Sequence, residues 1–169
     1  MKWVLLLRAV NVGGRNTLPM KDLKALLEDL GHHDVKTYLN SGNATFESKS
    51  RSAQKLATAI EAGLRERVGI DVRLCVRSTG NVKRALDELP ELAGYVVLTF
   101  LFDKPEAAAL QRMLESDWSP DTLVGNDQVL YITYAADLHS SKLTNARVEK
   151  LLAVSSTART PATVRRLLG

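Results

Sequence analysis

Residues 2–31 have the sequence KWVLLLRAVNVGGRNTLPMKDLKALLEDLG, and this stretch decides the fold. Residues 2–7 form a near-continuous apolar run, which is typical of a strand buried on both faces. Residues 18–31 repeat apolar side chains at helical spacing and end at Gly31, so they predict a helix. A strand that leads through a glycine-containing loop into a helix predicts a protein of mixed helices and strands.

The next residues continue this pattern. Residues 34–39 (DVKTYL) alternate like a strand that places Val35, Thr37 and Leu39 on one face. The elements expected after it are a tight turn at 41–43, a strand at 44–48, a helix at 52–68 and a strand at 70–78. The order is β-α-β-β-α-β, the split β-α-β pattern of a ferredoxin-like domain, and it predicts an α+β fold.

The remaining residues predict a second α/β half, although no matching residues mark a repeat of the first. The expected elements are a helix at 82–89, a strand at 95–102, a helix at 104–116, a hairpin of 122–125 and 128–134, and two basic helices near 142–153 and 161–168. No long linker interrupts the chain. We therefore expect a single domain over residues 1–169, with halves of about 1–78 and 79–169.

Composition excludes several classes of protein. The chain has 169 residues, of which 45% are hydrophobic and 25% charged, as in ordinary globular proteins. Its longest apolar runs, residues 3–7 and 95–102, are far shorter than the roughly 18–20 residues that span a bilayer. The first residues do not resemble a secretory signal, and the single cysteine, Cys75, cannot form an internal disulfide. We expect a cytoplasmic protein without a membrane partner.

Charge is distributed unevenly along the sequence. Residues 1–78 contain 13 Lys and Arg against 8 Asp and Glu (net +5), residues 79–139 contain 4 against 10 (net −6), and residues 140–169 contain 6 against 1 (net +5). Two basic segments therefore flank an acidic one. A basic surface attracts phosphate groups, although an ordinary solvated surface would show the same pattern.

Polar residues gather first in the loop after the N-terminal strand, at Arg8, Asn11, Gly13, Gly14, Arg15 and Asn16. Glycines let a backbone approach a ligand, and free N–H groups near a helix start bind anions. The alternative is that the asparagines tie the loop to itself. The spacing is neither GxGxxG nor GxxxxGK(S/T), so it predicts neither a dinucleotide site nor a P-loop.

Two further segments carry polar groups. Residues 37–43 (TYLNSGN) suit a hairpin turn, and in this segment Tyr38 and Asn40 share a face; the segment also holds Ser41, Gly42 and Asn43. Residues 141–160 hold Lys142, Asn145, Arg147, Lys150 and Arg159. A lysine and an arginine from separate helix ends would clamp a phosphate or carboxylate, whereas a solvated basic helix is the plain alternative.

Evidence for other chemistry is weak. No Ser-His-Asp, paired-carboxylate or HExxH pattern is present. His32 and His33 lack further ligands at metal-binding spacing, and Cys75 has no evident histidine partner. The sequence therefore predicts no catalytic residue, no metal and no cofactor.

Three motifs together resemble the domain-of-unknown-function 1697 family: residues 6–31, residues 35–48 (VKTYLNSGNATFES), and SKLTNARVEKLL with TART between 141 and 160. The resemblance covers about residues 2–168 and implies an α+β, ferredoxin-like fold in a bacterial cytoplasmic protein, without an established activity. The family's shared polar positions correspond here to Arg8, Asn11, Gly13, Gly14, Asn16, Tyr38, Asn40, Ser41, Gly42, Asn43, Lys142, Asn145, Thr157 and Arg159. Two departures are Ala9, where the family has glycine, and TARTPAT at 157–163, which lacks two asparagines of the family pattern.

Three hypotheses about function follow. The first is a binding module for an anionic ligand such as a nucleotide, with phosphate on Arg8, the 11–16 loop, Lys142 and Arg159 and a base on Tyr38. A long RNA fits less well, because the strands lack the paired exposed aromatics of an RNA-recognition motif. The second is a structural module in which the polar motifs lock the fold and a partner protein is bound. The third is an enzyme on a small phosphorylated or carboxylated substrate, with Tyr38, Lys142 or Glu149 as base.

Overall fold

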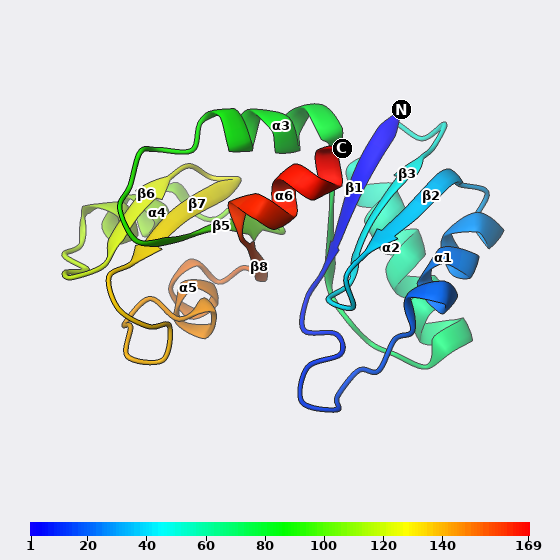
Figure 1. Cartoon of the computed structure of the whole chain (residues 1–169), viewed down its shortest axis with the longest axis horizontal. Coiled ribbons are helices and arrows are strands. Elements are labelled where there is room, and N and C mark those ends of the chain that lie inside the picture. Colours follow the sequence, from blue (N-terminus) through cyan, green and yellow to red (C-terminus); the bar gives the residue numbers. More distant parts are fainter. The chain divides into compact units, whose positions relative to one another are not determined.

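The computed structural model describes residues 1–169 (Figure 1). Its first elements are β1 (Lys2–Leu7), α1 (Met20–Asp29), β2 (His33–Tyr38), β3 (Asn43–Glu47), α2 (Ala53–Gly63), a short π-helix (Leu64–Val68) and β4 (Leu74–Ser78). They are followed by α3 (Thr79–Asp87), β5 (Tyr95–Leu101), α4 (Ala107–Glu115), β6 (Thr122–Gly125), β7 (Val129–Tyr134), α5 (Asn145–Leu152), β8 (Ser156–Arg159) and α6 (Pro161–Leu168). The predicted α+β class is confirmed.

The chain divides into two compact units. The first comprises Met1–Arg84 and Arg165–Gly169, and the second comprises Ala85–Val164. The division falls inside α3, a few residues later than the sequence suggests, and the end of α6 belongs with the first unit.

The first unit is built on an antiparallel sheet with the strand order β2-β3-β1-β4. Each of α1 and α2 connects two parallel strands that have a third strand between them, which gives two interleaved split β-α-β units. Both helices bury their apolar sides against the same face of the sheet, because alternate residues of β1 point there. This core contains Trp3, Leu5 and Leu7 of β1, Leu23, Leu26 and Leu27 of α1, and Leu56 and Ile60 of α2.

The second unit has an antiparallel sheet with the order β6-β7-β5-β8. Its elements β5-α4-β6-β7-α5-β8 repeat both the element order and the strand order of the first unit. The apolar sides of α4 and α5 share a core with β5 and β7, formed by Val97, Leu101, Met113, Ile132, Val148 and Leu152 among others. The two units therefore have the same topology, although the sequence shows no matching residues.

Several details differ from the sequence prediction, among them the start of β4, which is Leu74 rather than residue 70. Between the two C-terminal helices lies β8, which pairs with β5 and was not predicted. Leu39 does not continue the face of Val35: β2 ends at Tyr38, and Leu39 adopts φ 56° and is 54% exposed. Finally, α3 begins at Thr79 rather than at residue 82. No helix of the protein is both long and apolar enough to cross a membrane.

Candidate functional site

The loop between β1 and α1 is held by the side chain of Asn11. Its Nδ2 donates to the carbonyl oxygens of Leu18 (2.9 Å) and Asn40 (2.5 Å), and its Oδ1 accepts from the Leu18 N–H (2.8 Å). The Asn11 N–H also donates to the carbonyl oxygen of Asn16 at 3.2 Å. One side chain therefore closes the loop ahead of α1 and joins it to the turn between β2 and β3.

The β2–β3 turn packs directly on this loop at Gly42. The Leu7 N–H donates to the Gly42 carbonyl oxygen at 2.8 Å. A Cβ atom at Gly42 would lie 2.6 Å from Val10 Cγ2 and 2.7 Å from Leu7 Cβ, and the residue has φ +75°. Only glycine fits this close approach. The structure thus brings together the first two polar clusters, which the sequence alone does not place relative to each other.

Other polar groups of these clusters are also engaged locally. Asn43 is fully buried, and its Nδ2 donates to the Tyr38 carbonyl oxygen (3.1 Å) and to Ser41 Oγ (2.8 Å). Asn16 Nδ2 donates to the carbonyl oxygen of Ala9 at 3.3 Å. Ala9 itself has φ 53°, a conformation that glycine adopts with less strain.

The exposed part of the loop is its tip, with Gly13, Gly14, Arg15 and Asn16, while Arg8 at the base is half-buried. Gly13 and Gly14 have φ of 58° and 72°, and a Cβ at either would meet nothing within 4 Å. These glycines therefore allow the backbone to turn with a positive φ, and no close contact within the protein requires them.

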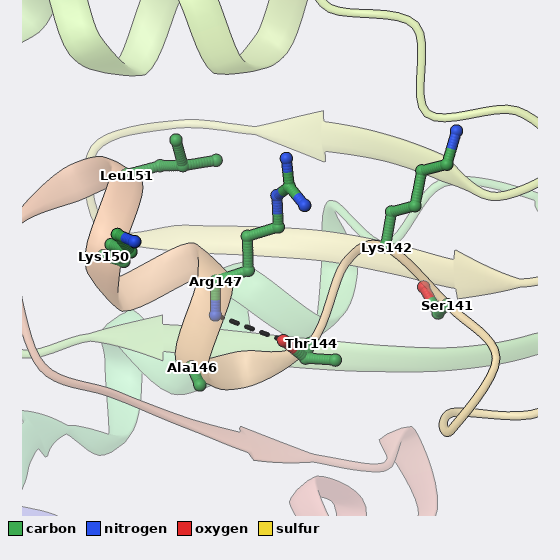
Figure 2. Close-up of a pocket in the computed structure, with 7 residues that line it drawn as sticks. All are labelled: Ser141, Lys142, Thr144, Ala146, Arg147, Lys150 and Leu151. Carbon is green, nitrogen blue, oxygen red and sulfur yellow. Dashed lines mark hydrogen bonds between the residues drawn. The ribbon is translucent and has the colours of Figure 1, made fainter.

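The third polar cluster contributes to a pocket of about 630 Å³ in the second unit (Figure 2). We call it the basic pocket; it is lined by Ser141, Lys142, Thr144, Ala146, Arg147, Lys150 and Leu151. Arg147 and Lys150 lie one turn apart on the exposed side of α5, and Lys142 lies just before the helix. Figure 2 shows Lys142 and Arg147 extending to the same side of this segment.

The basic pocket has a positive electrostatic character. No acidic side chain lines it, and none of its three cations forms a salt bridge. The Arg147 guanidinium lies 5.8 Å from the centre of the Trp118 ring, a cation–π contact. Nearby, hydrogen bonds from Ser119 lower the pKa of Asp117, and the charge of Lys142 lowers it further.

The segment before α5 is fixed by Asp121, which the sequence analysis did not single out. Asp121 Oδ2 accepts from Ser141 Oγ (2.5 Å), and Asp121 Oδ1 accepts from the Ala135 N–H (2.9 Å). Ser141 Oγ in turn accepts from the Leu143 N–H at 2.9 Å. No sequence motif marks Asp121, because its partners lie 14 and 20 residues away. This network positions the backbone on either side of Lys142.

Asn145 lies at the first turn of α5 but does not line the basic pocket. Its Oδ1 accepts from Ser156 Oγ at 2.8 Å, and its Nδ2 lies 3.4 Å from the carbonyl oxygen of Ser156. Glu149 Oε1 accepts from the Ser156 N–H at 2.8 Å. Asn145 and Glu149 therefore join α5 to β8, and the carboxylate that the sequence offers as a general base is part of this network.

Arg159 is separated from Lys142. It pairs with Leu98 across the sheet, so its side chain points away from the face that carries Val97 and α5. Its Nη1 donates to Thr157 Oγ1 (2.6 Å) and to the Ala158 carbonyl oxygen (2.8 Å). The clamp of Lys142 with Arg159 is not formed, and Arg147 stands beside Lys142 instead.

The chemistry available at the basic pocket is therefore the binding of anions. Lysine and arginine provide charge and N–H donors, and Thr144 accepts from the Arg147 N–H at 3.2 Å to cap α5. No group of three or more His, Cys, Asp or Glu side chains in the protein is arranged to hold a metal ion.

The fold defines the chain as an α+β protein of two antiparallel four-stranded sheets with the same strand order. It belongs to the family described as "Protein of unknown function (DUF1697)", which matches residues 1–131. The match includes the first two polar clusters and ends before the basic pocket. The fold is similar to that of a conserved bacterial protein, SP0830, from Streptococcus pneumoniae, with a TM-score of 0.76, 22% identity, and 99% of this chain and 96% of that chain covered. No curated protein matches the chain.

Proposed function

We propose that this protein is a non-catalytic binding module for an anionic ligand and that the basic pocket holds a phosphate group of that ligand. One observation carries the proposal: Lys142, Arg147 and Lys150 line a single pocket that has no acidic side chain in its lining. Like charges held together repel one another, and a bound anion relieves that repulsion.

The hydrogen-bond donors of the basic pocket are of a kind that favours phosphate as the ligand. Arg147 offers a planar fork that binds two oxygens at once, while Lys142 and Lys150 offer point charges. The contact with Trp118 restricts the guanidinium, which lowers the entropy lost on binding. The N-terminal turn of α5 adds a weak positive potential at Asn145, next to the pocket.

Calorimetric titration with inorganic phosphate, pyrophosphate and AMP, at about 50 and 200 mM salt, tests the proposal. We expect binding that weakens as salt rises, because ions screen exposed charges. Lys142→Gln and Arg147→Gln should each weaken binding about two- to fivefold, the size typical of exposed ion pairs. Arg112→Gln is the matched control, since Arg112 is an exposed arginine of the same unit that does not line the pocket.

Two results would contradict the proposal. One is the absence of binding by the unchanged protein at the lower salt concentration. The other is an equal affinity of the Arg147→Gln and Arg112→Gln proteins for the same anion.

The first two polar clusters favour a second role, which is structural. The contacts of these clusters lie within the protein. Asn11 forms four hydrogen bonds through its backbone and side chain, and Asn43 forms two. Gly42 packs closely on Leu7 and Val10. We propose that these residues lock the β1–α1 loop to the β2–β3 turn. The exposed loop tip is then a surface that the lock holds in one conformation.

A further inference from the structure

The first unit presents apolar side chains to solvent where the β1–α1 loop meets the β2–β3 turn. Val12 is 63% exposed and Leu39 is 54% exposed. Apart from the terminal Met1, they are the only large apolar side chains of the first unit that are exposed. Each is next in sequence to a partner of the hydrogen bond between Asn11 and Asn40, so the two lie on adjoining segments. Exposed apolar side chains that gather in this way mark an interaction site, whereas singly scattered ones do not.

The tip of the β1–α1 loop, which Figure 1 shows extending beyond the end of β1, is a small hairpin. The Arg15 N–H donates to the Val12 carbonyl oxygen at 3.1 Å, and the two residues pair in antiparallel fashion. Gly13 and Gly14 between them both have a positive φ, as two-residue hairpin turns require. Residues that pair directly across such a hairpin project their side chains to the same face. Val12 and Arg15 therefore place an apolar group beside a guanidinium.

The charge of this surface is positive. Arg15 is exposed, and its guanidinium forms no salt bridge and no hydrogen bond within the protein. Residues 8–19 contain Arg8 and Arg15 and no acidic residue, and residues 37–46 contain no charged residue. A partner that is complementary to this surface therefore brings a carboxylate to Arg15.

The turn holds Leu39 in a strained conformation. Leu39 has φ 56°, in the left-handed region, where a bulky side chain is an outlier. The strain does not serve the core, because the side chain is exposed. The turn is fixed by the hydrogen bond from Asn11 to Asn40 and by the packing of Gly42 on Val10. Strain of this kind clusters where a residue is held ready for a partner, and a surface that is already rigid loses little entropy on binding.

We propose that residues 12–17 and 39–41 form a docking surface for an acidic peptide segment of a partner protein, and we call it the loop-tip surface. A large aliphatic or aromatic side chain of that segment covers Val12 and Leu39, and a neighbouring carboxylate pairs with Arg15. A nucleic acid would match the charge but would leave the two aliphatic side chains without an apolar partner. The inference uses the contacts that lock the loop to the turn, and it is independent of phosphate binding at the basic pocket, which lies in the second unit.

Selection from a phage-displayed library of random twelve-residue peptides, with the full-length protein as bait, tests this inference. Selected peptides are then synthesised and titrated into nitrogen-15-labelled protein. We expect them to combine Asp or Glu with Leu, Ile, Phe or Trp. We also expect them to cause saturable shifts at the amides of residues 12–16 and 39–41.

Leu39→Asn separates binding from folding. Asparagine adopts the left-handed conformation with less strain than leucine, so this variant should unfold at a higher urea concentration than the unchanged protein. It should nevertheless bind the selected peptide about tenfold more weakly, because an apolar contact is lost. Arg15→Gln should weaken binding about two- to fivefold, the size typical of an exposed ion pair.

Val12→Thr keeps the branched shape of the side chain and should weaken binding about threefold or more. Val124→Thr is its matched control, because Val124 is a valine of the second unit that is 43% exposed. The inference is overturned if no selected peptide shifts the loop-tip amides, if the selected peptides lack acidic residues, or if Leu39→Asn and Val12→Thr bind as tightly as Val124→Thr. It is also overturned if these amides respond instead to the concentration of the protein itself, which would indicate a second copy of the chain, or to a single-stranded oligothymidylate.

Discussion

The amide of Asn11 connects its own loop to Leu18, which lies two residues before α1, and to Asn40 in the β2–β3 turn. Asn11→Ala leaves the Leu18 N–H without its acceptor, so we expect the free energy of unfolding to fall by about 1–3 kcal/mol. Urea unfolding measures this loss. Asn16→Ala, which removes a single 3.3 Å bond at an exposed residue that has a positive φ like Asn11, is the control for backbone strain and should lower stability less than Asn11→Ala does. Equal effects of the two substitutions would show that the lock does not stabilise the fold.

His32 makes the stability of the first unit depend on pH. Its ring stacks on Phe46 at 4.6 Å between centroids, and its Nε2 is buried without a partner. Desolvation lowers the pKa of His32 below its ordinary value of 6.5, and the charge of His33 lowers it further. Between the lowered pKa and 6.5 the unfolded chain binds more protons, so stability rises with pH there and is lost as the pH falls.

Urea unfolding of the protein between about pH 5 and pH 8 tests the role of His32. The His32→Phe protein, which keeps a ring against Phe46 and cannot be protonated, should lose less stability on acidification than the unchanged protein. His139→Gln is the control, because His139 is exposed. An identical loss on acidification in the His32→Phe protein would assign the pH dependence to other groups.

The stability of helix α5 depends on its N-terminal capping residue, Thr144. Thr144 Oγ1 accepts from the Arg147 N–H, and the same turn carries Arg147 into the basic pocket. Thr144→Ala should lower the stability of the second unit by about 1 kcal/mol, whereas Thr144→Ser should retain it. Trp118 fluorescence in a Trp3→Phe background reports on the second unit alone during urea unfolding, because these are the two tryptophans of the chain. Equal stabilities of the alanine and serine proteins would show that the cap contributes nothing.

The helices and most strands can be predicted from sequence, because their apolar spacing is local. Ile70, Val72, Leu74 and Val76 alternate in the sequence and all four join the core of the first unit. The four-residue strand β8 could not be predicted, since its identity depends on pairing with β5, about sixty residues earlier. The candidate site was predictable only in part. Lys142 lines the basic pocket, as the sequence suggests, but the side chain of Arg159 lies on the other side of the sheet. The direction of the Arg159 side chain follows from strand alternation only once β8 is known.

The two units of the molecule share one topology, although no matching residues mark a repeat between their sequences. The strand orders β2-β3-β1-β4 and β6-β7-β5-β8 are equivalent, position by position. A topology of this kind requires only that apolar residues alternate on strands and repeat every three or four residues on helices. Many sequences meet that requirement, so the repeat is evident in the structure and not in the residues. The polar residues are free to differ between the two units, and the basic pocket lies in the second unit.

The residues at 165–169 have a consequence for the order in which this protein is made. They belong with the first unit, and Leu167 among them is 2% exposed. A ribosome synthesises residues 1–84 first, but it reaches residues 165–169 only after the whole second unit has been translated. Domains generally fold as units while the chain emerges. Here the first unit, although most of it is translated first, cannot acquire residues 165–169 until the whole second unit has been translated.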